Sequence, residues 1–89
     1  MYTIRFSKAA DKHKKMLRQA GLEANARRLL NVISENPYQN PPPYEALVGN
    51  LKGFLSRRIN IRHRLVYEVF EEEKTVRILS MWSHYDNVR

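Results

Sequence analysis

All four prolines of this 89-residue chain lie between Asn36 and Tyr44, in the stretch NPYQNPPPY. Proline lacks a backbone N–H and its φ angle is fixed, so this stretch cannot form a regular helix or a central strand. The prolines therefore divide the chain into two parts. We expect an ordered connector or loop here, with regular structure on both sides of it.

The part before the connector predicts a strand and two helices. Alternating β-branched and aromatic residues predict a strand over Tyr2–Phe6, and Ser7 can cap the helix that follows. Apolar residues recur at helical spacing over Lys8–Ala20 and again over Leu22–Asn36. Gly21 ends the first helix and the connector ends the second. The two helices predict a hairpin that packs on another layer.

The part after the connector predicts three strands, over Leu55–Ile61, Arg64–Phe70 and Thr75–Trp82. Short turns separate them, so an antiparallel meander is expected. A chain below roughly 150 residues rarely holds a second core. The sequence thus predicts one α+β domain over residues 1–89. An N-terminal strand is followed by a helical hairpin and then by a three-stranded antiparallel meander that completes one sheet.

Composition excludes several classes of protein. The chain has no cysteine, so it predicts neither a disulfide framework nor a thiolate metal site. It has no apolar run near the roughly 18 residues of a membrane span, and its N-terminus lacks the apolar core of a signal peptide. We expect a cytoplasmic protein without a membrane partner.

Metal and nucleotide chemistry also lack a sequence motif. His13, His63 and His84 are far apart, and no pair has the helical i, i+4 spacing of a zinc motif. The three glycines are isolated, so no glycine-rich loop is present to hold a phosphate. We expect no metal and no cofactor.

The charge balance points to a polyanionic partner. Sixteen Lys and Arg against nine Asp and Glu give a formal net charge of +7. A positive patch of this kind attracts phosphates and adds sequence-independent affinity, although excess charge can also serve only solubility. The stretch from residue 52 to 64 has no acid and holds five cations, Lys52, Arg57, Arg58, Arg62 and Arg64.

The residues around this patch fit RNA cleavage without a metal. Such cleavage needs a base for the 2′-hydroxyl proton, a cation for the charge on the phosphoryl oxygens and an acid for the leaving 5′-oxygen. Glu45 follows the connector, arginines lie in the predicted strands, and His84 with Tyr85 follows the last strand. Histidine holds a proton near neutral pH, and the arginine fork matches a phosphate.

Structural roles for the same residues remain open. Glu45 could be a solvated loop acid or a helix cap, and His84 could be a surface residue. Side chains alternate along a strand, so only one of Arg57 and Arg58 need face the patch.

At these residues the sequence resembles the Txe/YoeB group of RelE-like toxins, the messenger-RNA-cleaving halves of bacterial toxin–antitoxin pairs. That group has a proline-glutamate-leucine connector, an asparagine-leucine-x-glycine-aromatic stretch ending in serine-arginine-arginine, a histidine-arginine-leucine-valine-tyrosine strand and a final histidine-tyrosine pair. The matching segments here are Tyr44–Leu47, Asn50–Arg58, His63–Tyr67 and His84–Tyr85. Val48 stands where the group commonly has lysine, which removes one candidate phosphate contact.

The resemblance implies a RelE-like microbial ribonuclease fold and a ribosome-dependent endoribonuclease that cuts mRNA in the ribosomal A site without a metal. It makes Glu45 the general base and His84 the general acid. It makes Arg64 the group that stabilises the phosphorane, Arg58 the phosphate contact and Tyr85 the group that places the nucleotide.

Further contacts and partners are expected on the same ground. Lys52, Arg57 and Arg62 are expected to bind RNA or the ribosome. The implied partner is an antitoxin of the YefM/Axe type whose acidic C-terminal segment covers the basic face or displaces His84 and Tyr85. Operator DNA would be bound only through the complex with the antitoxin, and members of the group also tend to form homodimers.

Two other functions remain open on the sequence. A toxin of the same fold that acts by binding, like the ParE-type gyrase poisons, would need the basic surface but not an acid–base pair. A basic nucleic-acid-binding module without catalysis would need the arginines but not His84. The presence of both Glu45 and His84 favours the enzyme.

Overall fold

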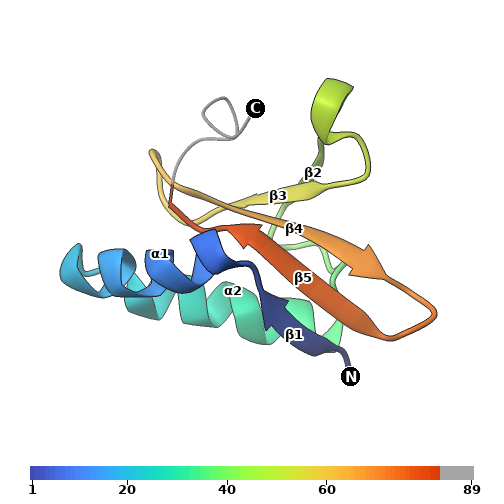
Figure 1. Cartoon of the computed structure of the whole chain (residues 1–89), viewed down its shortest axis with the longest axis horizontal. Helices are drawn as coiled ribbons and strands as arrows, with labels where there is room; N and C mark the ends of the chain where they lie inside the picture. The colour runs from blue at the N-terminus through green and yellow to red at the C-terminus, as the bar shows by residue number, and fades with distance from the viewer. Residues whose placement is uncertain (83–89) are drawn as a thin grey trace.

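The computed structural model describes residues 1–82, and residues 83–89 lie outside the described part. Two helices and a five-stranded sheet form two layers (Figure 1). In chain order the elements are β1 (Thr3–Phe6), α1 (Lys8–Gln19), α2 (Glu23–Glu35), β2 (Glu45–Ala46), the 3₁₀ helix η1 (Gly49–Leu51), β3 (Leu55–Arg58), β4 (Arg64–Phe70) and β5 (Thr75–Ser80). The expected α+β fold is confirmed.

The strands lie in the order β1-β5-β4-β3-β2. The expected meander is present, because β3 pairs antiparallel with β4 and β4 with β5. The first strand of the chain pairs parallel with the last described strand, from Thr3 opposite Thr75 to Phe6 opposite Ile78. Both helices lie on one side of the sheet, which leaves the other face to β-strand side chains (Figure 1).

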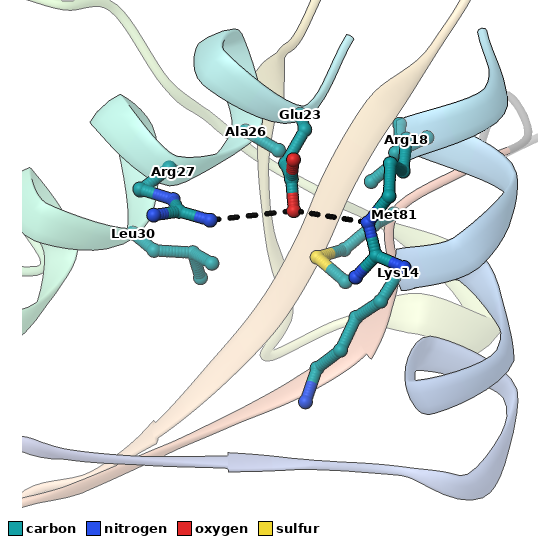
Figure 2. A pocket seen from close by; sticks show the side chains of 8 residues that line it. Lys14, Arg18, Glu23, Ala26, Arg27, Leu30 and Met81 are labelled. Carbon is teal, nitrogen blue, oxygen red and sulfur yellow. Dashed lines mark hydrogen bonds and ion pairs between the residues drawn. The ribbon is translucent and has the colours of Figure 1, made fainter. Parts of the chain in front are cut away.

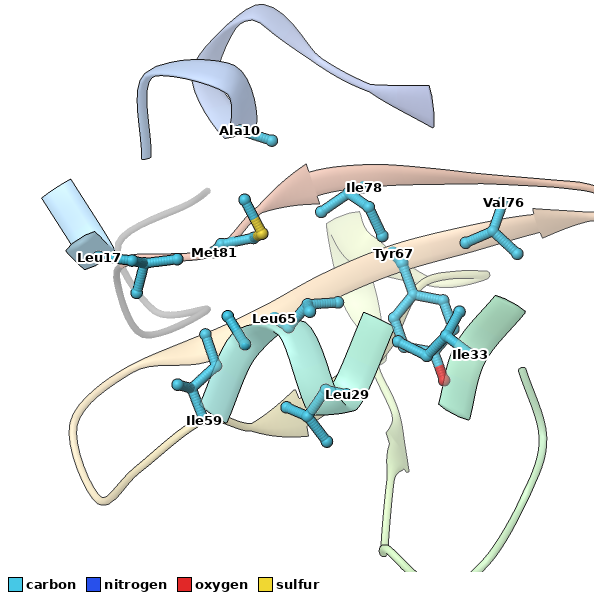
Figure 3. Close-up of a cluster of buried hydrophobic side chains, with 11 residues drawn as sticks. Ala10, Leu17, Leu29, Ile33, Ile59, Leu65, Tyr67, Val76, Ile78 and Met81 are labelled. Carbon is cyan, nitrogen blue, oxygen red and sulfur yellow. The ribbon is translucent and has the colours of Figure 1, made fainter. Parts of the chain in front are cut away.

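The core lies between the helices and the sheet. Figure 3 shows side chains of α1 and α2 meeting side chains of β4 and β5. The buried residues of this cluster are Ala10, Leu17, Ala26, Leu29, Ile33, Ile59, Leu65, Tyr67, Val76, Ile78 and Met81. Because alternate strand residues face the helices, the residues between them point to the open face of the sheet.

Ser7 ties the start of α1 to the end of the sheet. Its Oγ accepts a hydrogen bond from the Ala10 amide at 3.0 Å, as expected for a helix cap. The same hydroxyl donates to the Leu79 carbonyl at 2.7 Å. One side chain thus fixes the orientation of α1 against β5.

Three strand boundaries and one strand differ from the sequence prediction. The first strand begins at Thr3 instead of Tyr2. The strand predicted over Leu55–Ile61 ends at Arg58, because Asn60 Oδ1 accepts from the amides of Arg62 and His63 and turns the chain. The last strand ends at Ser80 instead of Trp82. The connector is irregular as expected, but it leads into the two-residue strand β2, which the sequence did not predict.

No helix within residues 1–82 is both long and apolar enough to span a bilayer.

Candidate active site

Three neighbouring strands bring the candidate residues together on the open face of the sheet. Glu45 of β2 lies opposite Ser56 of β3, and Arg58 of β3 lies opposite Arg64 of β4. A shallow hollow of about 170 Å³ opens at this place. It is lined by Pro43, Tyr44, Glu45, Ser56, Arg58 and Arg64. Glu45, Arg58 and Arg64, predicted from the sequence, therefore share one site.

Arg64 is held over the middle strand of this site. Its Nη1 donates to Glu45 Oε1 at 2.9 Å and to Ser56 Oγ at 3.2 Å. The Arg64 side chain is 16% exposed and the Glu45 side chain 51% exposed. The guanidinium is therefore restricted in position, while the carboxylate next to it remains accessible to a bound molecule.

Arg58 gives the hollow an excess of positive charge. It is exposed and lies directly opposite Arg64 in the register of β3 and β4. Like charges in directly opposite positions of a sheet repel each other, and an anion between them relieves the repulsion. The site thus favours a bound anion next to a carboxylate that can accept a proton.

Arg57 is not part of this surface, and its expected contact with RNA is corrected here. Its side chain is 0% exposed and points to the helix side of the sheet, where its Nε donates to the Tyr67 hydroxyl at 3.0 Å. The alternation along β3 explains the difference, because Ser56 and Arg58 occupy the open face and Arg57 occupies the other.

Lys52 and Arg62 are exposed but lie apart from the hollow. Lys52 follows η1, and Arg62 lies in the turn between β3 and β4, where its amide donates to Asn60 Oδ1 at 2.8 Å. Neither residue lines the hollow. Both positions allow a contact with a larger partner that extends beyond the site.

His84 and Tyr85 lie outside the described residues. The backbone that leads toward them is held at Met81 and Trp82 by two histidines. The Met81 amide donates to His13 Nδ1 at 3.1 Å. The His63 ring stacks on the Trp82 ring with centroids 4.2 Å apart, and His63 Nδ1 lies against the Trp82 carbonyl oxygen.

Burial of the His13 imidazole lowers its pKa. The neutral ring that this favours is the form in which Nδ1 can accept the hydrogen bond from the Met81 amide.

The sequence did not single out Ser56, Tyr44 or His13 as parts of a site. Ser56 could have been found from strand alternation, because it shares a face with Arg58. His13 carries no comparable signal, since its contact with Met81 joins residues 68 positions apart.

A second hollow of about 250 Å³ lies between α1 and α2. Figure 2 shows Glu23 at its edge between Arg18 and Arg27, to which its Oε2 is paired at 3.4 and 3.3 Å. Its lining includes apolar side chains of Leu17, Ala26, Leu30 and Met81. None of the sequence-predicted site residues that fall within residues 1–82 lines it.

Within residues 1–82 no group of three His, Asp or Glu side chains is placed to hold a metal ion.

The comparisons with known proteins point to the same family. Residues 6–85 match the family model described as YoeB-like toxin of bacterial type II toxin-antitoxin system. The curated Toxin YoeB of Synechocystis is 36% identical over 72 residues, which cover 81% of this chain and 74% of that protein.

Solved structures agree with this match. The heterotetrameric YoeB–YefM toxin–antitoxin complex from Staphylococcus aureus contains a chain that is 34% identical, with a TM-score of 0.79 over 96% of this chain and 99% of that chain. The YoeB/ParE toxin from Agrobacterium tumefaciens has a TM-score of 0.84 over 93% of this chain and 99% of its own. At 21% identity the second likeness concerns the fold.

Proposed function

The chain belongs to the family of YoeB-like toxins of bacterial type II toxin–antitoxin systems, and from this premise we propose that it is a ribosome-dependent endoribonuclease. It cuts mRNA in the ribosomal A site by acid–base catalysis without a metal and so inhibits translation. The observation that carries the proposal is the ion pair of Arg64 with Glu45 at 2.9 Å, beside Arg58 in an open hollow. A carboxylate can serve as the base and the two guanidinium groups as the phosphoryl-binding cations, which are two of the three roles that metal-free phosphodiester cleavage requires.

In the proposed reaction Glu45 takes the proton of a 2′-hydroxyl group. The 2′-oxygen then bonds to the adjacent phosphorus, the bond from phosphorus to the 5′-oxygen breaks, and a 2′,3′-cyclic phosphate remains. Arg64 and Arg58 stabilise the negative charge that gathers on the phosphoryl oxygens.

The leaving 5′-oxygen must receive a proton. We assign this to His84 and assign placement of the nucleotide to Tyr85, on the family resemblance, since both residues lie outside the described part of the chain. His13 and His63 contact Met81 and Trp82, the last described residues before that segment.

The proposed partners follow from the family and from the surface charge. An antitoxin of the YefM type is supported by the Staphylococcus aureus YoeB–YefM complex, and a homodimer by the solved YoeB dimer from the same organism. Lys52 and Arg62 are proposed contacts to the ribosome or mRNA, and operator DNA is reached only through the antitoxin complex. With these proposed partners, the proposed location is the cytoplasm.

The test is primer extension on a defined mRNA, with and without programmed ribosomes that have an empty A site. Discrete cuts are expected only with ribosomes, and they should be lost in Glu45→Gln and His84→Gln. Glu72→Gln is the matched control, because it makes the same chemical change at an exposed residue of the β4–β5 turn. Growth arrest without any cuts would contradict the proposal and direct the search to a binding target such as gyrase.

A further inference from the structure

Arg57 is the largest fully buried side chain within the described residues, and its guanidinium is turned toward the connector. Nη2 donates to the carbonyl oxygens of Pro37 and Gln39 at 3.1 and 2.9 Å, and Nη1 donates to that of Pro42 at 2.5 Å. The guanidinium carbon also lies 5.0 Å from the centroid of the Tyr44 ring. One side chain therefore contacts the connector along most of its length.

This arrangement supplies hydrogen-bond partners both to the Arg57 guanidinium and to the carbonyl oxygens of the connector. A buried charge is costly unless hydrogen bonds replace its water shell, and here carbonyl dipoles supply them. The connector in turn cannot join a β-ladder through its prolines, so its carbonyl oxygens need other donors. The Tyr67 hydroxyl adds a second tie, because it donates to the Pro37 oxygen at 2.7 Å and accepts from Arg57 Nε.

The clamped connector ends next to the proposed base. Tyr44 is followed by Glu45, the first residue of β2. This strand pairs with β3 through Glu45 and Ala46, and one further backbone hydrogen bond joins the Leu47 amide to the Phe54 carbonyl oxygen at 2.9 Å. A two-residue edge strand has little pairing to hold it in register. The position of Glu45 beside Arg64 thus depends also on what holds the chain that precedes it.

We propose that Arg57 is a positioning residue, which clamps residues 37–44 from within the fold and thereby fixes the Glu45 carboxylate beside Arg64. It touches no substrate. The catalytic part of this inference rests on the proposed function, since it takes Glu45 as the base. The structural part, the clamp itself, does not depend on it.

The first experiment measures the clamp by amide hydrogen exchange in the full chain. Arg57→Lys keeps the charge but cannot reach several carbonyl oxygens at once. We expect exchange in the connector and β2 to rise by about tenfold or more, with α1, α2 and β5 close to wild type. Val76→Ala is the control, because it removes buried side-chain atoms of β5 without removing a hydrogen bond to the connector and should speed exchange more evenly.

The second experiment is a double-mutant cycle in single-turnover cleavage of ribosome-bound mRNA. Arg57→Lys should lower the rate by about tenfold with Glu45 present and by less than about twofold in the Glu45→Gln background. Ribosome binding should stay within about twofold of wild type in both, because the altered group is buried.

The outcomes separate the inference from the proposed function. Unchanged exchange of the connector, exchange that rises equally in all elements, or additive rate losses in the cycle would overturn the role of Arg57. If the wild-type chain cleaves no mRNA, the proposed function fails, and the exchange experiment still decides whether the clamp exists. Should Arg57→Lys not fold, Tyr67→Phe replaces it in both experiments, since it removes the hydroxyl shared by Arg57 and Pro37.

Discussion

Arg64 of β4 reaches Glu45 of β2 across the intervening strand β3, with its Nη1 2.9 Å from Glu45 Oε1. The hydroxyl of Ser56 on β3 lies under this bridge and accepts from the same nitrogen at 3.2 Å. The proposed base and the proposed phosphoryl-binding cation are therefore fixed relative to each other by three strands. An enzyme that depends on placing such groups gains its rate from this kind of fixed geometry.

Replacing Glu45 by glutamine should separate catalysis from stability. The amide keeps the size of the side chain but cannot take a proton, so single-turnover cleavage should fall by roughly 10²–10⁴-fold. The Glu45 side chain is 51% exposed, and the loss of such an ion pair should change the free energy of unfolding by about 1 kcal/mol or less. Urea unfolding and cleavage are measured on the same preparation, and a cleavage rate near that of wild type would exclude Glu45 as the base.

Arg64→Lys should affect the rate more than the affinity. Arg64 Nη1 donates to both Glu45 and Ser56. Lysine keeps the charge but loses the planar guanidinium, so it cannot fix the phosphoryl oxygens in the same way. We expect a loss of about 10²-fold or more in the single-turnover rate, with ribosome binding changed by about threefold or less. Equal losses in the two quantities would show that Arg64 serves mainly to bind.

Lys52→Ala should have the opposite effect. Lys52 is exposed and lies apart from the hollow, so its removal should weaken ribosome binding with little change in the rate at saturation. The dependence of log affinity on log salt should become shallower by roughly one unit if Lys52 contacts a phosphate. The check is a binding titration at several salt concentrations; an unaltered salt slope would mean that Lys52 contacts no phosphate.

Tyr67→Phe tests the buried polar cluster through stability. The change removes the hydroxyl that joins Arg57 Nε and the Pro37 carbonyl and leaves both buried groups short of a partner. We expect a loss of about 1–3 kcal/mol in the free energy of unfolding. Tyr67→Phe keeps the ring and removes one oxygen atom, whereas a truncation such as Leu79→Ala would also change the volume of the side chain. A chemical denaturation midpoint equal to that of wild type would contradict the assigned hydrogen bonds.

His13 should make stability depend on pH. Burial lowers the pKa of its imidazole below the ordinary value of 6.5, so the unfolded chain binds a proton at a higher pH than the folded chain does. The free energy of unfolding should therefore decrease as the pH falls through about 6.5 and level off below the folded pKa. Urea midpoints of wild type and His13→Gln, measured between about pH 8 and about pH 5, isolate this contribution by difference. A constant difference across the range would contradict it.

The fold was largely predictable because its signals are local. Capping by Ser7, helical spacing on both sides of Gly21 and β-branched runs after the connector each act within a few residues. The strand β2 was missed because two residues carry no periodicity, and Glu45 and Ala46 become a strand only through pairing with β3. The parallel pairing of β1 with β5 was missed for the same reason, since it depends on residues far apart in the chain.

The sequence predicted the residue types of the candidate site, but not which face of the sheet each side chain occupies. Glu45, Arg58 and Arg64 meet as expected, whereas Arg57 turns inward. A one-residue step along a strand reverses the side, and the sequence alone did not settle which member of the arginine pair was exposed. The inward position became clear only with the connector, whose carbonyl oxygens require a donor at that place.

The pairing of β1 with β5 also bears on how the chain folds as it is synthesised. The pairing of β1 with β5 cannot form until Thr75 is available to Thr3, and the Ser7 hydroxyl likewise needs the Leu79 carbonyl. Contacts of such long sequence separation carry a large loop-closure entropy and slow the folding of small domains. A growing chain can therefore form its two helices before its sheet is complete, because β1 lacks its neighbour until β5 is available.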